Sequence, residues 1–149
     1  MAGPERERTV QGLLEATGRE LMTALDAQAC AISRIVGDLL ISLVAVARGK
    51  GTLEIAHEYL ISDYPLTLEV VTTGAPRAVS RLEAAPEPTE AELLEQFGFE
   101  SLLMVCLRTA NECWGLVEVY ANGKQFGEEE TRLAEQIVGH AGRRLDGLG

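Results

Sequence analysis

Two apolar segments in the C-terminal half of the chain constrain the fold most. Residues 101–108 and 114–120 are rich in aliphatic and β-branched side chains, and the short polar stretch 109–112 separates them. This pattern predicts two antiparallel strands joined by a turn. Because residues 102–107 are almost continuously apolar, the first of these strands is expected to be covered on both faces. The rest of the chain must therefore supply cover for two sides of a sheet.

A second hairpin is predicted in the N-terminal half. Residues 29–35 and 39–47 are small, β-branched or apolar, and Gly37 and Asp38 separate them. Glycine adopts the positive φ that a tight hairpin turn requires. Two hairpins favour a mainly antiparallel sheet. Shorter strands are expected at residues 52–56 and 77–80.

Both ends of the chain carry helical periodicity. Apolar residues recur at spacings of three and four in residues 5–26 and again in residues 127–145. Glu128, Glu129 and Glu130 lie in the first turn of the second segment, where they complement the helix dipole. Each helix has one apolar face, so we expect both to pack on the same face of the sheet.

The middle of the chain predicts two short helices. Pro65 suits a first helical position, and Gly74 suits the end of that helix. Thr89 is expected to cap the second, with Glu92 completing a capping box, and the helix ends near Phe97. The fold class is therefore α+β: a central antiparallel sheet with the N- and C-terminal helices on one face and mid-chain helices and loops over the other.

Composition limits the range of functions. The 149 residues carry a net charge of −10, which disfavours nucleic-acid and membrane-surface partners. No apolar run could span a bilayer, and residues 1–9 lack a secretory h-region, so a cytoplasmic location is expected. Three cysteines without repeated spacing do not predict a disulfide framework, and Cys106 and Cys113 are interpreted as small buried hydrophobes. The two histidines lack metal-ligand spacing, so no metal is expected.

Four motifs in this order resemble the GAF domain family. Residues 73–79 (TGAPRAV) resemble its "TG-x-P-x-x-V" turn into a strand, and residues 98–107 (GFESLLMVCL) resemble its "G-x-x-S-x-L-x-VPL" strand, with Cys106 where proline is usual. Residues 114–120 (WGLVEVY) and 126–129 (FGEE) resemble its following strand and the start of its closing helix. The resemblance covers about residues 10–146 of what is expected to be a single domain, 1–149.

The resemblance implies a GAF/PAS-like bacterial sensory or regulatory domain rather than an enzyme. A ligand cavity in this family lies under the middle helices and loops. No Cys-His pair is present for bilin attachment, and residues 80–100 contain no histidine for haem, so neither cofactor is expected. Some GAF proteins reduce free methionine sulfoxide, but their clustered cysteines lie in middle loops, where this chain has none.

Glu118 leads to a candidate ligand site. Strand alternation places it on one face with Trp114, Leu116 and Tyr120, and a carboxylate among apolar neighbours needs a partner. We expect Arg34 to pair with it and the two to orient a ligand beside three further residues, Tyr64, Thr67 and Phe97. The alternative is a structural ion pair or a strand edge facing solvent.

Three functional hypotheses remain. The first is a cytoplasmic sensory domain that binds a small molecule, signals to an output protein and forms a homodimer through its terminal helices, with Met22, Ala134 or Val138 left uncovered. The second is a dimerisation scaffold without a ligand. The third is a cysteine-based redox enzyme similar to the free methionine sulfoxide reductases.

Overall fold

A six-stranded sheet forms the centre of the computed structural model, which describes residues 9–48, 58–110 and 112–148. The strand order is β3-β2-β1-β6-β5-β4, and all neighbouring strands are antiparallel. The predicted antiparallel sheet is thus confirmed, while the strand expected at residues 52–56 lies outside the described residues. The strands are β1 (Ala29–Val36), β2 (Leu39–Ala47), β3 (Tyr59–Leu60), β4 (Arg77–Ser80), β5 (Ser101–Thr109) and β6 (Glu112–Ala121).

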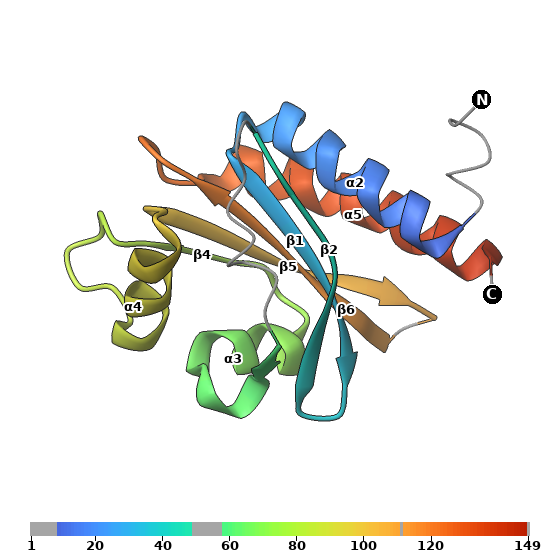
Figure 1. Ribbon diagram of the computed structural model, residues 1–149, viewed down its shortest axis with the longest axis horizontal. Coiled ribbons are helices and arrows are strands. Elements are labelled where there is room, and N and C mark those ends of the chain that lie inside the picture. Colours follow the sequence, from blue (N-terminus) through green and yellow to red (C-terminus); the bar gives the residue numbers. More distant parts are fainter. Residues whose placement is uncertain (1–8, 49–57, 111, 149) are drawn as a thin grey trace.

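The helices cover both faces of this sheet. Helices α2 (Val10–Leu25) and α5 (Glu128–Leu148) lie side by side on one face, and α3 (Pro65–Thr73) and α4 (Pro88–Phe97) lie on the other (Figure 1). A 3₁₀ turn, η2 (Ile61–Asp63), leads into α3. The predicted α+β arrangement, with the terminal helices on a common face, is therefore confirmed.

The face of the sheet under α2 and α5, which we call the helix-side face, is closed by the tight packing of these two helices. Thr9 caps α2 by accepting a hydrogen bond from the Gly12 amide at 2.9 Å, and residues 5–8 of the predicted helix lie outside the described residues. A Cβ atom on Gly142 of α5 would lie 2.2 Å from the carbonyl oxygen of Arg108. Only glycine allows α5 to lie this close to β5.

Three residues expected to remain uncovered on these helices are instead buried. Met22 is 5% exposed, Ala134 is 0% exposed and Val138 is 1% exposed. They belong to the core cluster between the sheet and the two helices. The prediction that they would face a partner is wrong, because α2 and α5 pack against one another as well as against the sheet.

The start of α4 differs from the predicted capping box. Glu87, not Thr89, is the N-cap, and its carboxylate accepts hydrogen bonds from the amides of Thr89 at 3.2 Å and Glu90 at 2.9 Å. Pro88 takes the first helical position, which suits its fixed φ and missing N–H. The helix therefore begins earlier than predicted, and Glu90 turns toward the sheet, where it is 1% exposed.

A β-bulge interrupts the β5–β6 hairpin. Leu107 lies opposite Gly115 and Arg108 lies opposite Cys113, so Trp114 is the extra residue. A bulge of this kind reverses the alternation of side chains beyond it. Trp114 therefore packs against the helix-side cluster, and Cys113 against the cluster of the opposite face. The prediction that Trp114 shares a face with Glu118 is wrong for this reason.

Candidate functional site

The buried charged side chains lie on the face covered by α3 and α4, which we call the α3/α4 face. Glu118 lies between Leu116 and Tyr120 on β6 and opposite Met104 on β5, and these three residues belong to the core cluster of that face. Glu90 reaches the same region from α4. The cluster on the opposite face consists of apolar residues and Cys30. The α3/α4 face is therefore the chemically distinctive part of the core.

Glu118 is a buried carboxyl with a hydroxyl beside it. It is 4% exposed, and the Tyr120 hydroxyl donates a hydrogen bond to its Oε2 at 3.3 Å. Burial, with a smaller contribution from the negative charge of Glu90, raises the pKa of Glu118 to about 8, although the Tyr120 hydrogen bond opposes the change. A carboxyl with this pKa exchanges its proton near neutral pH.

Glu90 is held by a contact between α3 and α4. The Thr67 hydroxyl donates a hydrogen bond to Glu90 Oε2 at 2.7 Å, and the same hydroxyl lies 3.5 Å from the sulfur of Met104 on β5. Burial raises the pKa of Glu90, the hydrogen bond from Thr67 opposes this, and Glu87 adds to the rise. Thr67 thus joins both helices to the sheet at the position of the second buried carboxyl.

Aromatic rings surround the two carboxyls. Tyr59 lies 5.4 Å from Tyr64 and 6.4 Å from Phe97 between ring centroids, and Phe97 lies 6.0 Å from Tyr120. Phe99 stacks on Tyr120 at 5.2 Å. Burial, reinforced by Glu118, raises the pKa of both Tyr59 and Tyr120, so their hydroxyls keep their protons at neutral pH.

Four of the five predicted site residues lie on the α3/α4 face: Tyr64, Thr67, Phe97 and Glu118. Their role in ligand binding stays a prediction. Sequence reasoning missed Glu90, which is buried on the same face of α4 as Leu94 and Phe97. The signal in the sequence was its spacing, because Glu90 lies four residues before Leu94 and seven before Phe97.

Arg34 does not pair with Glu118. It lies opposite Gly115, and its Nη1 donates hydrogen bonds to the carbonyl oxygens of Ile35 at 2.9 Å and Trp114 at 2.7 Å. Its guanidinium stacks on the Trp114 ring, 4.6 Å from the centroid. Trp114 packs against the helix-side cluster. The predicted Arg34–Glu118 pair is wrong, because alternation along β1 and the bulge in β6 bring Arg34 to Trp114.

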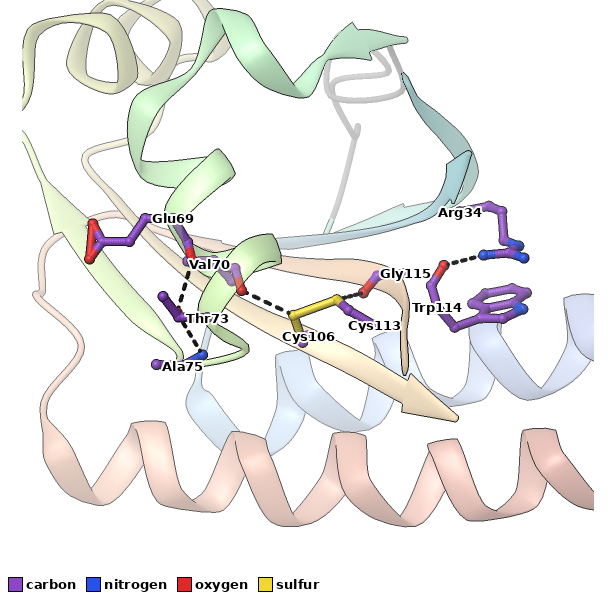
Figure 2. Close-up of a disulfide and its surroundings, with 9 residues drawn as sticks. All are labelled: Arg34, Glu69, Val70, Thr73, Ala75, Cys106, Cys113, Trp114 and Gly115. Atoms are coloured by element: carbon purple, nitrogen blue, oxygen red, sulfur yellow. Dashed lines mark hydrogen bonds between the residues drawn. A yellow bond between two sulfur atoms is a disulfide. The ribbon is translucent and has the colours of Figure 1, made fainter. Parts of the chain in front are cut away.

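A disulfide joins Cys106 of β5 to Cys113 of β6 (Figure 2). Their Cα atoms are 5.6 Å apart, and the bond lies between the sheet and α3. The interpretation of both cysteines as unlinked hydrophobes is therefore wrong, because the bulge at Trp114 turns Cys113 toward Cys106. Cys30 is a free thiol in the helix-side cluster, where burial raises its pKa.

Two cavities are relevant to a site. One of about 170 Å³ opens beside Tyr64 and is also lined by Thr89, Glu92, Leu93 and Gln96. A wider one, of about 540 Å³, lies at the start of α5 and includes none of the predicted site residues. Position near the buried carboxyls, rather than volume, makes the first cavity the better candidate for ligand entry.

The described residues contain neither a candidate metal site nor a candidate membrane-spanning helix. No group of three or more histidine, cysteine, aspartate or glutamate side chains in residues 9–48, 58–110 and 112–148 could hold a metal ion. Within those same ranges, every helix is too short or too polar to cross a membrane.

The sheet order, the helix placement and the motifs together define a sensory-domain fold, and residues 9–145 match the GAF domain family. The chain belongs to the GAF domain family, a family of small-molecule-binding sensory domains. No curated protein matches the sequence.

Solved structures with similar folds include cyanobacteriochromes and another protein with a GAF domain. The cyanobacteriochrome receptor PixJ has a TM-score of 0.79 at 12% identity, over 97% of this chain and 99% of that chain. A GAF domain/HD domain protein from Geobacter sulfurreducens has a TM-score of 0.78 at 14% identity, over 93% of each chain. The red/green cyanobacteriochrome NpR6012g4 has a TM-score of 0.77 at 19% identity, over 93% of this chain and 94% of that chain. At these identities the similarity establishes the fold alone.

Proposed function

We propose that this GAF domain senses a small molecule that carries a positively charged group, such as an organic amine or guanidine, at Glu118 on the α3/α4 face. The observation that carries the proposal is the burial of Glu118 close enough to Glu90 for their charges to interact. Among the described residues, no ion pair joins either carboxyl to a cation. A basic ligand supplies the missing charge.

Electrostatics give the expected coupling between ligand and proton. Burying an unpaired carboxylate is costly, so the free domain favours the protonated form of Glu118 at neutral pH. A cation near this group favours the ionised form and lowers its pKa. Binding should therefore release a proton and strengthen as the pH rises from 7 toward the Glu118 pKa of about 8. Tyr64, which lines the nearby cavity, offers an aromatic face for cation–π contact with the same ligand.

Thermal melting with a panel of primary amines and guanidines, matched with neutral and carboxylate analogues, tests the proposal. We expect members of the basic set to raise the melting temperature, with larger shifts at pH 8 than at pH 6.5. Glu118→Gln should remove these shifts, whereas Glu20→Gln, at an exposed position on α2, should retain them. Equal shifts in both variants, or stabilisation by carboxylates alone, would contradict the proposal.

The proposed sensor forms a homodimer through its terminal helices and passes its signal to an output protein in the cytoplasm, without catalysis. Support comes from Leu133, which is 38% exposed on α5, and from the half-buried Ile137 one turn further. Light scattering after gel filtration should give a dimer for the parent and a monomer for Leu133→Glu. Leu68→Glu, at an exposed leucine on α3, should remain dimeric. A monomeric parent protein would contradict the proposed homodimer.

A second candidate is a dimerisation scaffold without a ligand. The observation that favours it is the contact of Tyr59, Phe97, Phe99 and Tyr120, whose rings pack against one another beside Glu118. Native mass spectrometry of freshly purified protein distinguishes the two. A bound small molecule that is lost in Glu118→Gln supports the sensor. A ligand-free dimer, combined with no melting shift across the panel, supports the scaffold.

A further inference from the structure

The Cys106–Cys113 pair lies at an accessible edge of the sheet. Strand β4 pairs with β5 only at residues 101–104, so residues 105–109 of β5 extend beyond it. A cavity of about 120 Å³ at this edge is lined by Cys106 and Arg108, with Gly74 from the end of α3 and Glu135 from α5. Cys113 is half-buried. Cys106 itself is 6% exposed, so the half-buried Cys113 and the cavity beside Cys106 are the approaches for a small reagent.

Arg108 is a neighbour of both cysteines in the sheet. It lies directly opposite Cys113 across the hairpin and two residues after Cys106 on the same strand. Its guanidinium packs over Gly74, where a Cβ atom would overlap it. A neighbouring guanidinium stabilises a thiolate, which is the form of cysteine that reacts with oxidants and disulfides. The reduced pair thus has the surroundings of a reactive dithiol, unlike the enclosed Cys30.

We infer that Cys106 and Cys113 form a reversible redox switch that responds to hydroperoxides and low-molecular-weight thiols and changes how α3 is attached to the sheet. The Cys106 sulfur lies 3.3 Å from the carbonyl oxygen of Val70 on α3 (Figure 2). A thiol can donate its hydrogen to this oxygen, whereas a disulfide sulfur has no hydrogen to donate. Thr67, one turn earlier on α3, holds Glu90, so the switch reaches the proposed sensory site without depending on it.

The chemistry balances with a hydroperoxide as oxidant. One thiolate attacks the peroxide oxygen and becomes a sulfenic acid, and the alcohol, or water from hydrogen peroxide, leaves. The second thiolate attacks that sulfur, forms the S–S bond and releases water. Two electrons pass from the cysteines to the peroxide. For reduction, two molecules of a low-molecular-weight thiol exchange with the protein disulfide and leave as their own disulfide.

Thiol counting tests the switch on the full chain. After reduction by dithiothreitol and denaturing alkylation, mass spectrometry should find all three cysteines modified. After treatment with hydrogen peroxide or oxidised glutathione, only Cys30 should be modified, and the unalkylated protein should be lighter by two hydrogens. Cys30→Ala should retain the response, whereas Cys113→Ser should abolish it. Arg108→Gln should slow disulfide formation roughly tenfold at pH 7. A chain that keeps three alkylatable thiols, or a disulfide that excess glutathione leaves intact, would overturn the switch.

Hydrogen exchange tests the coupling to α3. Amides of residues 65–74 should exchange roughly twofold to fivefold faster in the oxidised protein, the effect expected from the loss of one S–H···O contact. Amides of α2 should not change. Cys106→Ser, whose hydroxyl can donate to Val70 in any redox state, should keep the slower rate with or without peroxide. Equal exchange of α3 in both states of the parent would overturn the coupling.

Discussion

The two faces of the sheet bury different kinds of side chain. The cluster under α2 and α5 contains aliphatic residues, Phe126 and a free cysteine. The α3/α4 face buries two carboxyls, a tyrosine and a disulfide among its apolar residues. The difference shows a division of roles. The helix-side face stabilises the fold by removing apolar surface from water. The opposite face also contains carboxyls that can gain or lose a proton and a disulfide that can be reduced.

Among single substitutions, one that creates a cavity on the helix-side face should produce the largest loss of stability. Leu21 of α2 is fully buried in that cluster, so Leu21→Ala should lower the free energy of unfolding by about 3 kcal/mol. Urea denaturation followed by circular dichroism measures this. The control is Leu148→Ala on α5, where the leucine is 39% exposed and the change should stay below about 0.5 kcal/mol. Similar losses at both positions would remove the contrast between buried and exposed helix surfaces.

On the α3/α4 face, Glu118 should make stability depend on pH. Its pKa is about 8 in the folded protein against 4.5 for an unperturbed glutamate, so the folded state holds the extra proton between these values. The free energy of unfolding should therefore fall as the pH rises from 4.5 to 8, by up to about 1.4 kcal/mol per pH unit from this group. The stabilisation that comes from the raised pKa of Glu118 is fully present below pH 4.5.

Glu118→Gln should flatten this dependence and raise the stability at pH 8, because the side chain no longer ionises. Urea denaturation at half-unit intervals from pH 5 to pH 8.5 measures the slope. Glu20→Gln, on the exposed surface of α2, should keep the slope of the parent. If Glu118→Gln kept it too, the carboxyl would not be the group that titrates on this face.

The smallest effect is expected at the contact between α3 and α4. Thr67→Val removes the hydroxyl that donates to Glu90 while nearly preserving the volume of the side chain. Losing this bond should cost about 1–2 kcal/mol at pH 7, because it leaves a buried acceptor unsatisfied. Thr23→Val, at an exposed position of α2, should change stability by less than about 0.5 kcal/mol. An equal effect at both positions would show that Thr67 does not hold Glu90.

The sequence predicts the helix-side face well because that face follows simple periods. Apolar spacings of three and four identify α2 and α5, and two hairpins identify the antiparallel sheet. The placement of side chains on the α3/α4 face depends in part on single-residue irregularities, which hydrophobic periodicity does not predict. The extra residue in β6 places Trp114 and Cys113 on faces that strict alternation does not predict. Glu90 is different, because its spacing from Leu94 and Phe97 already indicates the buried face of α4. Arg34 was assigned a partner by proximity along the sheet, although it bonds to Trp114.

The bulge at Trp114 determines on which face of the sheet the sulfur of Cys113 lies. With strict alternation, a residue at the position of Cys113 would project from the opposite side of the sheet to Cys106. Deleting Trp114, the extra residue, would leave the second cysteine two residues before Leu116, where regular alternation keeps it on the Cys106 side without a bulge. Two GAF chains with the same pair of cysteines can thus differ in whether they need a bulge to crosslink: an odd spacing from the second cysteine to the next core residue on that face requires one, and an even spacing does not.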